Sequence, residues 1–127
     1  MIQKGSFLNV IDNSGAKIVC SLHLPMGYRK RYAFLGDVII VSVKKLRSKR
    51  KSLSKVKKGA VLKALIVRVV KSYCSHASER LSFFENSVVI LGKNNKFLGT
   101  RIFGSIPYKF RHSRFLRIFS LSSGTVF

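Results

Sequence analysis

The chain has 127 residues and is 46% hydrophobic, while its Lys and Arg residues number 25 against only 4 Asp and Glu residues. This length suits one domain, and this apolar content excludes a disordered basic peptide. The formal net charge of +21 indicates a polyanionic partner, either a nucleic acid or an anionic membrane. The longest apolar runs, VIIVSV and ALIVRVV, fall far short of the ~20 residues of a membrane-spanning helix, so membrane insertion is not expected.

Two strands are predicted in the N-terminal part of the chain. Alternating apolar residues indicate a strand over residues 7–11, and the turn sequence DNSGAK separates it from a second strand over residues 17–24. Pro25 and Gly27 end the second strand, and the basic stretch YRKRYA follows as a connection. The first residues run directly into this structure and are typical neither of a secretory signal nor of an import presequence, so a cleaved presequence has either already been removed or never existed.

A run of positive charge lies between the next two predicted strands. The β-branched stretches over residues 38–43 and 61–70 are best paired antiparallel, which makes residues 44–59 a long basic hairpin arm. This arm, KKLRSKRKSLSKVKKG, holds nine positive side chains and no negative one. Because like charges at this density repel one another, the arm is expected to face a polyanion.

The C-terminal third combines one more strand with two predicted helices. NSVVIL indicates a strand, and GKNNKFLG a turn rich in Gly and Asn. Ser105 and Pro107 are typical of a helix start, and Ser113 suits the cap of a second short helix. This second helix is expected to be amphipathic, with Arg114 and Arg117 on its outer face and Phe115, Leu116 and Phe119 on its inner face.

These elements predict a mainly β fold. Short strands at regular spacing, followed by small helices, indicate a small β-barrel with a projecting basic β-hairpin and short C-terminal α-helices. No internal repeat or linker interrupts the chain. We therefore expect a single domain over residues 1–127, with the barrel over 1–104 and a C-terminal helical segment over 105–121.

Enzymatic chemistry has little support in the sequence. The carboxylates are scattered, the histidines are isolated, and there is no P-loop or dinucleotide-binding glycine pattern. Cys20 and Cys74 lack the clustered partners that zinc requires, so reduced, partly buried thiols in a reducing compartment are expected. We expect no catalytic site, metal or cofactor. The scattered carboxylates are Asp12, Asp37, Glu79 and Glu85, and the isolated histidines are His23, His76 and His112.

Nucleic-acid binding explains the charge best. Lys and Arg neutralise phosphates and release counterions, so ~10 contacts predict that affinity falls with the logarithm of salt at a slope of roughly −7 to −9. Aromatic side chains lie among the basic ones and either stack on bases or pack in the core. Core packing is favoured for Phe110 and Phe115. For Tyr28 and Tyr32 base stacking and core packing are both open, and Tyr108 is a further candidate for base stacking.

Two other classes of protein remain as alternatives. A free single-stranded nucleic-acid binder with an OB-like barrel would expose stacking aromatics on its strands, whereas most aromatics here lie outside the predicted strands. A membrane-active cationic protein would need a long amphipathic helix. The only predicted helices are short and near the C-terminus.

Several motifs in one order resemble the universal large-subunit ribosomal protein fourteen family. The stretches are MIQ, LNVIDNSGAK, RYAFLGDVI, KVKKGAVLKALIVR, GTRIFG and FLRIFSL, and they extend from Met1 to about Leu121. The family pattern that runs from residues 64–67 to Phe83, Asn86, Val89 and Ile90 also matches. There are departures as well: Ala77-Ser78 replaces the usual Asp-Gly turn, Lys109 replaces a common Glu, the arm is longer and lacks Pro-Arg-Gly, and the ending SSGTVF is unusual.

The resemblance implies a five-stranded β-barrel that binds large-subunit rRNA and lies at the subunit interface, where it touches small-subunit rRNA in intersubunit bridges. It implies a neighbouring ribosomal protein of the nineteen family, and a face for silencing or anti-association factors at Thr100, Arg101 and Arg117. We expect rRNA binding by cationic side chains at Arg29, Lys30, Arg31, Lys44, Lys45, Arg47, Lys49, Arg50, Lys51, Lys55, Lys57, Lys58, Lys109, Arg111 and Arg114.

The composition also bears on the compartment. Few acidic residues, many Phe and Lys residues, a long arm and the missing presequence favour a protein encoded and used inside a mitochondrion. A plastid and the bacterial cytoplasm remain the alternatives.

Overall fold

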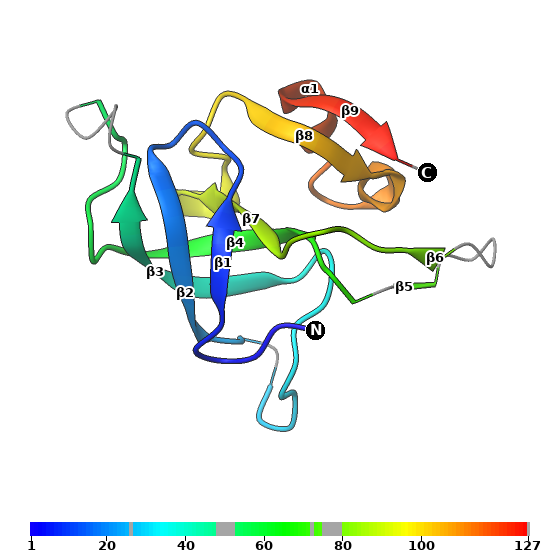
Figure 1. Ribbon diagram of the computed structural model, residues 1–127, viewed down its shortest axis with the longest axis horizontal. Helices are drawn as coiled ribbons and strands as arrows, with labels where there is room; N and C mark the ends of the chain where they lie inside the picture. The colour runs from blue at the N-terminus through cyan, green and yellow to red at the C-terminus, as the bar shows by residue number, and fades with distance from the viewer. Residues whose placement is uncertain (26, 48–52, 72, 75–79, 127) are drawn as a thin grey trace.

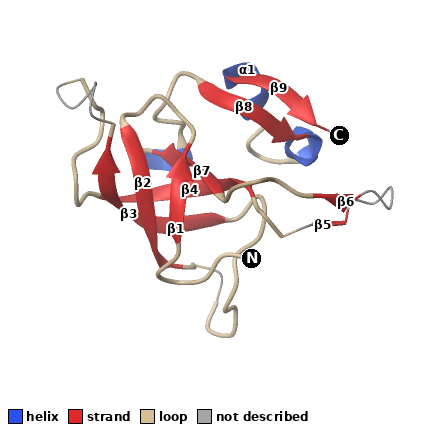
Figure 2. Cartoon of the chain, in the orientation of Figure 1, coloured by secondary structure: helices blue, strands red, loops and turns tan. Residues whose placement is uncertain are grey.

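Five strands close into a barrel that forms the body of the protein. The computed structural model describes residues 1–25, 27–47, 53–71, 73–74 and 80–126. Around the barrel the strands follow the order β1 (Phe7–Val10), β2 (Ala16–His23), β3 (Val38–Leu46), β4 (Val61–Arg68) and β7 (Ser87–Leu91) (Figure 1). β1 closes the barrel by pairing in parallel with β7, whereas the other neighbouring pairs are antiparallel. The predicted mainly β barrel is confirmed, and Figure 2 shows how little of the chain is helical.

The apolar runs form strands that are buried on both faces. All five residues of β7 are buried, and so are the consecutive residues 64–67 of β4. Successive side chains of a strand point to opposite faces, so one set fills the barrel and the other must be covered from outside. Ile106 and Ile118 of the C-terminal segment are fully buried, and β8 contacts β4. The C-terminal segment therefore covers the outer face of the barrel.

That segment, the C-terminal unit, comprises residues 102–126. It begins with β8 (Ile102–Pro107), which pairs in parallel with β9 (Ser122–Val126) at the end of the chain. Between them lie a 3-10 helix, η3 (Tyr108–His112), and one helical turn, α1 (Ile118–Leu121). Figure 1 shows these elements gathered on one side of the barrel. A further 3-10 turn, η2 (Lys93–Asn95), connects β7 to β8.

The C-terminal unit differs from the helical segment that the sequence predicts. The prediction of a helix start at Ser105 and Pro107 is wrong, because both residues belong to β8 and the 3-10 helix begins only at Tyr108. Pro107 has a φ of −66° with an extended ψ of 139°, a conformation that also suits the end of a strand. Leu116, predicted to face inward, is 55% exposed.

Ser113 opens a turn instead of capping a helix directly. Its hydroxyl donates to the Phe110 carbonyl at 3.0 Å and accepts the Phe115 N–H at 3.1 Å. The helix α1 starts only at Ile118. Phe115 is buried as predicted, and its ring meets Phe97 edge to face at 6.1 Å.

The basic arm joins β3 to β4, as predicted. The antiparallel register of β3 with β4 runs from Val38 opposite Leu65 to Ser42 opposite Val61, and the other edge of β3 pairs with β2 from Ile40 to Leu46. The arm tip, with the predicted rRNA-binding residues Lys49, Arg50 and Lys51, lies outside the described residues. A second, short hairpin pairs β5 (Tyr73–Cys74) with β6 (Arg80–Leu81). Its turn, with Ala77-Ser78 and His76, also lies outside them.

Candidate nucleic-acid interface

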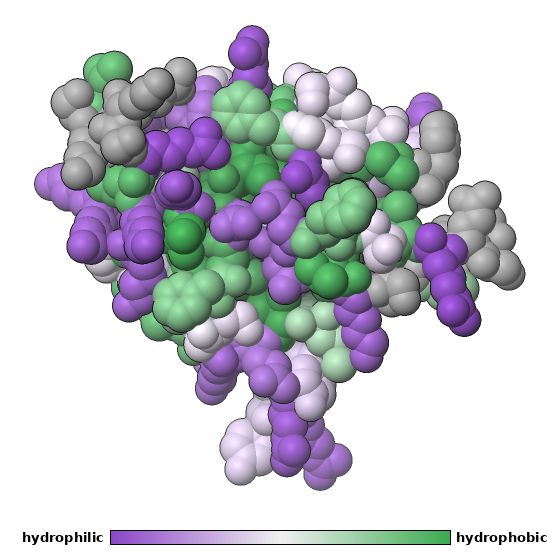
Figure 3. All heavy atoms as spheres, viewed as in Figure 1, coloured by the Kyte–Doolittle hydropathy of each residue, from purple (hydrophilic) through white to green (hydrophobic). Residues whose placement is uncertain are grey.

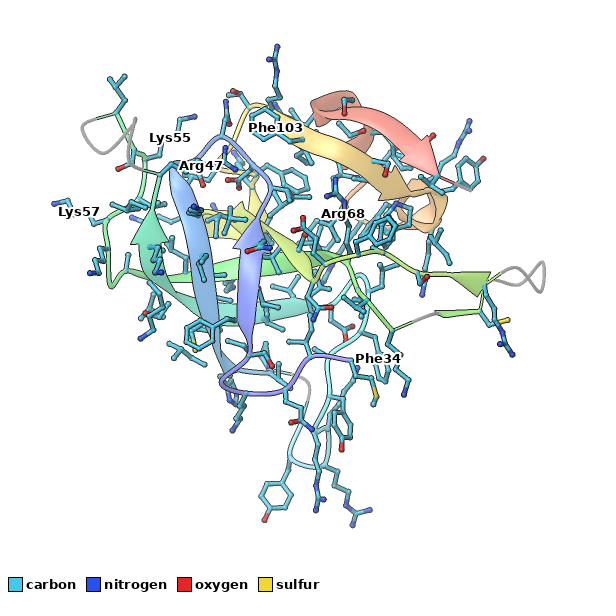
Figure 4. The ribbon with its side chains drawn as sticks, in the orientation of Figure 1. Phe34, Arg47, Lys55, Lys57, Arg68 and Phe103 are labelled. Carbon is cyan, nitrogen blue, oxygen red and sulfur yellow. The ribbon has the colours of Figure 1, made fainter. Side chains whose placement is uncertain are left out.

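The predicted rRNA-binding and subunit-interface residues that the structure describes, apart from Lys109, fall on three surfaces. The first, the arm surface, lies around the base of the arm, where Figure 4 labels Arg47, Lys55 and Lys57. Apart from Arg47, which is partly buried, its side chains are exposed. Its members are Lys44, Lys45, Arg47, Lys55, Lys57 and Lys58.

Backbone hydrogen bonds hold the arm against the turn after β1. The Arg47 N–H donates to the Gly15 carbonyl and the Lys55 N–H donates to the Ser14 carbonyl, both at 2.9 Å. Gly15 has a φ of +102°, and Ser54 packs where a side chain at this position would lie. Val56 is only 4% exposed and ties the second limb to the core. The base of the arm is therefore fixed relative to the barrel.

Two cations of the arm surface also bind within the protein. The Arg47 guanidinium donates to the Val10 carbonyl at 3.0 Å and lies 5.4 Å from the centre of the Phe103 ring. The Lys55 ammonium donates to the Leu98 carbonyl at 3.1 Å. Both side chains thus help to position the arm, and both keep a positive charge near its surface.

The second surface, the loop surface, consists of Arg29, Lys30 and Arg31 in the connection before β3. Lys30 forms an ion pair with Asp37 at 3.2 Å and lies 5.7 Å from the Phe34 ring centre. Asp37 also accepts the Phe34 N–H at 2.8 Å, which closes the loop. The Arg29 and Arg31 side chains are exposed.

The arm surface and the loop surface lie at opposite ends of β3. The loop precedes this strand of nine residues and the arm follows it. Lys44 and Lys45 of the arm surface belong to the last residues of β3, so the strand separates the two surfaces by the six steps from Val38 to Lys44, about 20 Å at ~3.3 Å per residue. Figure 1 shows the loop and the arm pointing away from the barrel in different directions.

The third surface, the C-terminal surface, comprises Thr100, Arg101, Arg111, Arg114 and Arg117, which are all exposed. Asn13 fixes its first two residues. The Asn13 Nδ2 donates to the Thr100 hydroxyl at 2.7 Å, and the Asn13 Oδ1 accepts the N–H groups of Thr100 and Arg101 at 2.7 and 3.3 Å. Gly99 is buried beside this contact, and a side chain there would collide with Asp12 and Asn13.

Part of the C-terminal surface lines a basic hollow of about 250 Å³. Three cations, two amides and two aromatic rings surround it: Lys96, Arg114, Arg117, Asn94, Asn95, Phe97 and Phe115. The Arg114 guanidinium lies 5.0 Å from the Phe115 ring centre. Similarly, Arg111 lies 5.4 Å from the Tyr108 ring centre and donates to its hydroxyl at 3.0 Å. Guanidinium groups held beside aromatic rings in this way suit phosphate and base contacts.

Lys109 lies elsewhere. It belongs to a different, mostly apolar hollow that it shares with residues from the N-terminus, the loop before β3, the segment after β4, and β6. The structure thus brings Arg114 and Arg117 together and separates Lys109 from them. Their binding to rRNA remains a prediction.

Arg68 is a structural residue that the sequence analysis missed. Its Nε donates to the Ser105 carbonyl at 2.8 Å and its Nη2 to the Phe103 carbonyl at 2.6 Å, so it joins β4 to β8. Glu85 lies 3.5 Å from Nη1. Burial lowers the pKa of Arg68, and the nearby Glu85 opposes that shift. A charge within the apolar run ALIVRVV was the available signal.

Asp12 is the second residue that was missed. It is fully buried, and it accepts the Ser14 N–H at 3.0 Å, the Ser14 hydroxyl and the Ile90 N–H at 2.8 Å. Burial raises the pKa of Asp12, although these hydrogen bonds and the nearby Arg47 oppose the shift. Asp12 therefore holds the turn that carries Asn13 against β7.

The aromatic candidates divide clearly. Phe110 and Phe115 are buried in the core, which confirms the packing interpretation for both. Tyr28 is fully exposed beside Arg29, and Tyr32 is partly buried. Tyr28 is thus the ring best placed to stack on a base.

The candidates for other chemistry form no site. Cys20 is partly buried and Cys74, contrary to prediction, is exposed; both are free thiols. Within the described ranges, no group of three or more His, Cys, Asp or Glu residues is arranged to hold a metal ion. Over the same residues, no helix is long and apolar enough to cross a membrane.

Comparison with models of protein families identifies the relatives of the chain. Residues 1–126 match the model described as Ribosomal protein L14p/L23e. The match includes the barrel, the arm and the C-terminal unit, and so covers all three cationic surfaces.

Proposed function

Because the chain belongs to the ribosomal protein L14p/L23e family, we propose that it clamps separate segments of large-subunit rRNA and presents a cationic face to the small subunit. Membership itself makes the chain a structural protein of the large ribosomal subunit that binds rRNA and serves translation. The family is typically non-enzymatic.

The observation that supports the clamp is the position of the loop surface and the arm surface at opposite ends of β3. A rigid barrel that holds two cationic surfaces about 20 Å apart along β3 suits two separate phosphate backbones. Phosphate contacts position a protein without reading sequence, so specificity comes from the shape of the folded rRNA. The predicted rRNA-binding residues act in this proposal as phosphate contacts.

The C-terminal surface is the face that we propose for the subunit interface. Thr100 and Arg101 are held by Asn13, and Arg117 lines the basic hollow. In the proposal these residues contact small-subunit rRNA in an intersubunit bridge, and a ribosome silencing factor uses the same face. A protein of the nineteen family is the proposed neighbour within the large subunit, and a mitochondrial ribosome is the proposed location, with plastid and bacterial ribosomes as alternatives.

Sedimentation tests the assembly directly. A lysate of the source cells or organelles is run on a magnesium-containing gradient, and the large-subunit fraction is then washed with high salt. We expect the chain to remain with the large subunit through the wash. A chain at the top of the gradient, or one removed at modest salt, would contradict the proposal and favour a free nucleic-acid binder. The lysate that supplies the signal identifies the compartment.

Charge reversal tests the clamp itself, with purified large-subunit rRNA and the full chain. Each of the double variants Arg29→Glu/Arg31→Glu and Lys57→Glu/Lys58→Glu should lower the salt slope of binding by about 2. The matched control, Lys4→Glu/Lys63→Glu, makes the same charge change at exposed lysines outside the three surfaces. Equal losses in all three variants would show that net charge alone drives binding, and would reject a clamp with defined surfaces.

A further inference from the structure

A mostly apolar hollow of about 290 Å³ opens between the N-terminus, the loop before β3, the end of β4 and η3. Leu35 and Val69 are buried and form its floor. Its other lining residues are Met1, Phe34, Lys71, Leu81, Phe83 and Lys109. The apolar portion of its wall far exceeds the polar portion. In the view of Figure 3 apolar patches interrupt the hydrophilic surface, and Figure 4 labels Phe34 near the N-terminus.

Phosphate contacts do not explain this hollow. Phe34 is 49% exposed and Met1 is 38% exposed, so a substantial apolar surface faces solvent in a protein whose charge is +21. A phosphate backbone gains nothing from such a wall, whereas an apolar side chain that enters it gains roughly 25 cal/mol for each Å² of surface buried. The hollow is also slightly below the usual range of small-molecule sites. It suits one or two side chains of a protein.

The positive charges at the rim of the hollow indicate which kind of protein segment it binds. Lys71 and Lys109 both line the hollow, and none of the lining residues that the structure describes is acidic. The Lys71 Nζ lies 3.9 Å from the Met1 sulfur, so this ammonium is held at the apolar wall. A carboxylate next to an apolar side chain complements this combination, because opposite charges across an interface favour the correct partner and register.

We propose that this hollow docks a segment of a neighbouring ribosomal protein that presents a large apolar side chain beside an acidic one. The apolar side chain enters between Phe34 and Phe83, and the carboxylate faces Lys71 and Lys109. A buried apolar anchor with charged groups at its edge is the usual arrangement of a small protein interface. The lining residues belong to none of the three cationic surfaces, although Phe34 adjoins the loop surface through Lys30, 5.7 Å from its ring centre. In this proposal Lys109 serves the protein contact in place of the phosphate contact predicted for it.

Labelled peptides test the proposal without RNA. Three peptides, Glu-Glu-Leu-Phe, Gln-Gln-Leu-Phe and Glu-Glu-Ser-Ser, are each labelled with fluorescein at the N-terminus and amidated at the C-terminus. The binding of each peptide to the full chain is measured by fluorescence anisotropy. We expect the first peptide to bind about fivefold more tightly than the second, since two exposed ion pairs contribute modestly. Glu-Glu-Ser-Ser should bind more weakly still. If it binds as tightly as Glu-Glu-Leu-Phe, general attraction to a cationic protein explains binding and the proposal is wrong.

Two variants and one control locate the site. Lys71→Glu should abolish the preference for Glu-Glu-Leu-Phe over Gln-Gln-Leu-Phe and create one for Lys-Lys-Leu-Phe, a gain that a misfolded variant could not show. Phe34→Ala should weaken every peptide that ends in Leu-Phe. Lys63→Glu, an equal charge change at an exposed position on β4, should keep the original preference. An unchanged preference in Lys71→Glu, or displacement of the peptide by unlabelled oligouridylate, would overturn the proposal in favour of another site or of a nucleotide.

Discussion

Replacing Arg68 by Met should loosen the C-terminal unit from the barrel. Arg68 makes two charge-assisted hydrogen bonds, to the carbonyls of Ser105 and Phe103, and its side chain is only 12% exposed. Such bonds contribute roughly 1.5–3 kcal/mol each. Part of this loss is recovered, because methionine avoids the cost of burying a guanidinium. The ion pair with Glu85 is half exposed, so its removal costs less than ~1 kcal/mol. We therefore expect the free energy of unfolding to fall by about 3 kcal/mol.

Urea unfolding at moderately high salt, followed by far-UV circular dichroism, measures this change, and the melting temperature should fall by roughly 12 °C. Limited proteolysis should cut the variant first within residues 102–126. Arg68→Lys should recover only part of the loss, because an ammonium cannot reproduce the two-pronged guanidinium contact. Arg117→Met, at an exposed position, is the control and should change stability by less than ~0.5 kcal/mol. A loss of unfolding free energy below ~1 kcal/mol in Arg68→Met would refute the role of Arg68 in joining β8 to the barrel.

Three further predictions follow from neighbouring features. Gly104→Ala should destabilise the protein by about 2 kcal/mol, because Gly104 has a φ of +81° and a side chain there would overlap the Arg68 guanidinium. In the double variant with Arg68→Met, the two losses of unfolding free energy should not add. Additive losses would disprove the contact between the two positions. Burial raises the pKa of Asp12 above its unfolded value of 3.8, so the stability that it contributes is fully present below that pH and is lost as pH rises through the folded pKa. The unfolding energy of the protein relative to that of Asp12→Asn should therefore fall as pH rises from about 3, and a rise would contradict the burial argument. Without RNA, the melting temperature should increase when salt is raised from about 0.02 M to about 0.5 M, and a robust transition unimproved by salt would refute self-repulsion.

The barrel could be predicted because its signals are local. The β-branched runs over residues 38–43 and 61–70 alternate or are continuously apolar, and each forms one strand of the barrel in the predicted antiparallel pairing. The arm followed from the same two runs, since whatever joins paired strands must project from them. The resemblance to the ribosomal protein fourteen family, based on motifs spread over the whole chain, is confirmed by the family match.

The C-terminal unit could not be predicted because its signals are ambiguous or distant. A Ser followed two residues later by Pro suits the start of a helix, yet it also suits an edge strand that lacks one N–H donor. β8 (Ile102–Pro107) owes its strand conformation to pairing with β9 (Ser122–Val126) at the end of the chain. β9 contains Ser and Gly, which have low strand propensity, so its sequence does not indicate a strand. Arg68 reaches carbonyls 35 and 37 residues away, and no local pattern indicates such a contact.

The use of the few carboxylates explains why charge and fold depend on each other. Asp12 holds the turn after β1 against β7, Asp37 closes the loop before β3, and Glu85 accepts from Asn9 and Ser87 besides pairing with Arg68. Each Asp and Glu side chain in the described part of the chain thus serves internal structure, and Asp12 and Asp37 also help to position a cationic surface. Intramolecular pairing leaves most of the 25 cations uncompensated, so the compensating negative charge must come from a partner. Any polyanion that binds only the folded chain stabilises it by mass action, which couples the folding of this protein to its binding of rRNA.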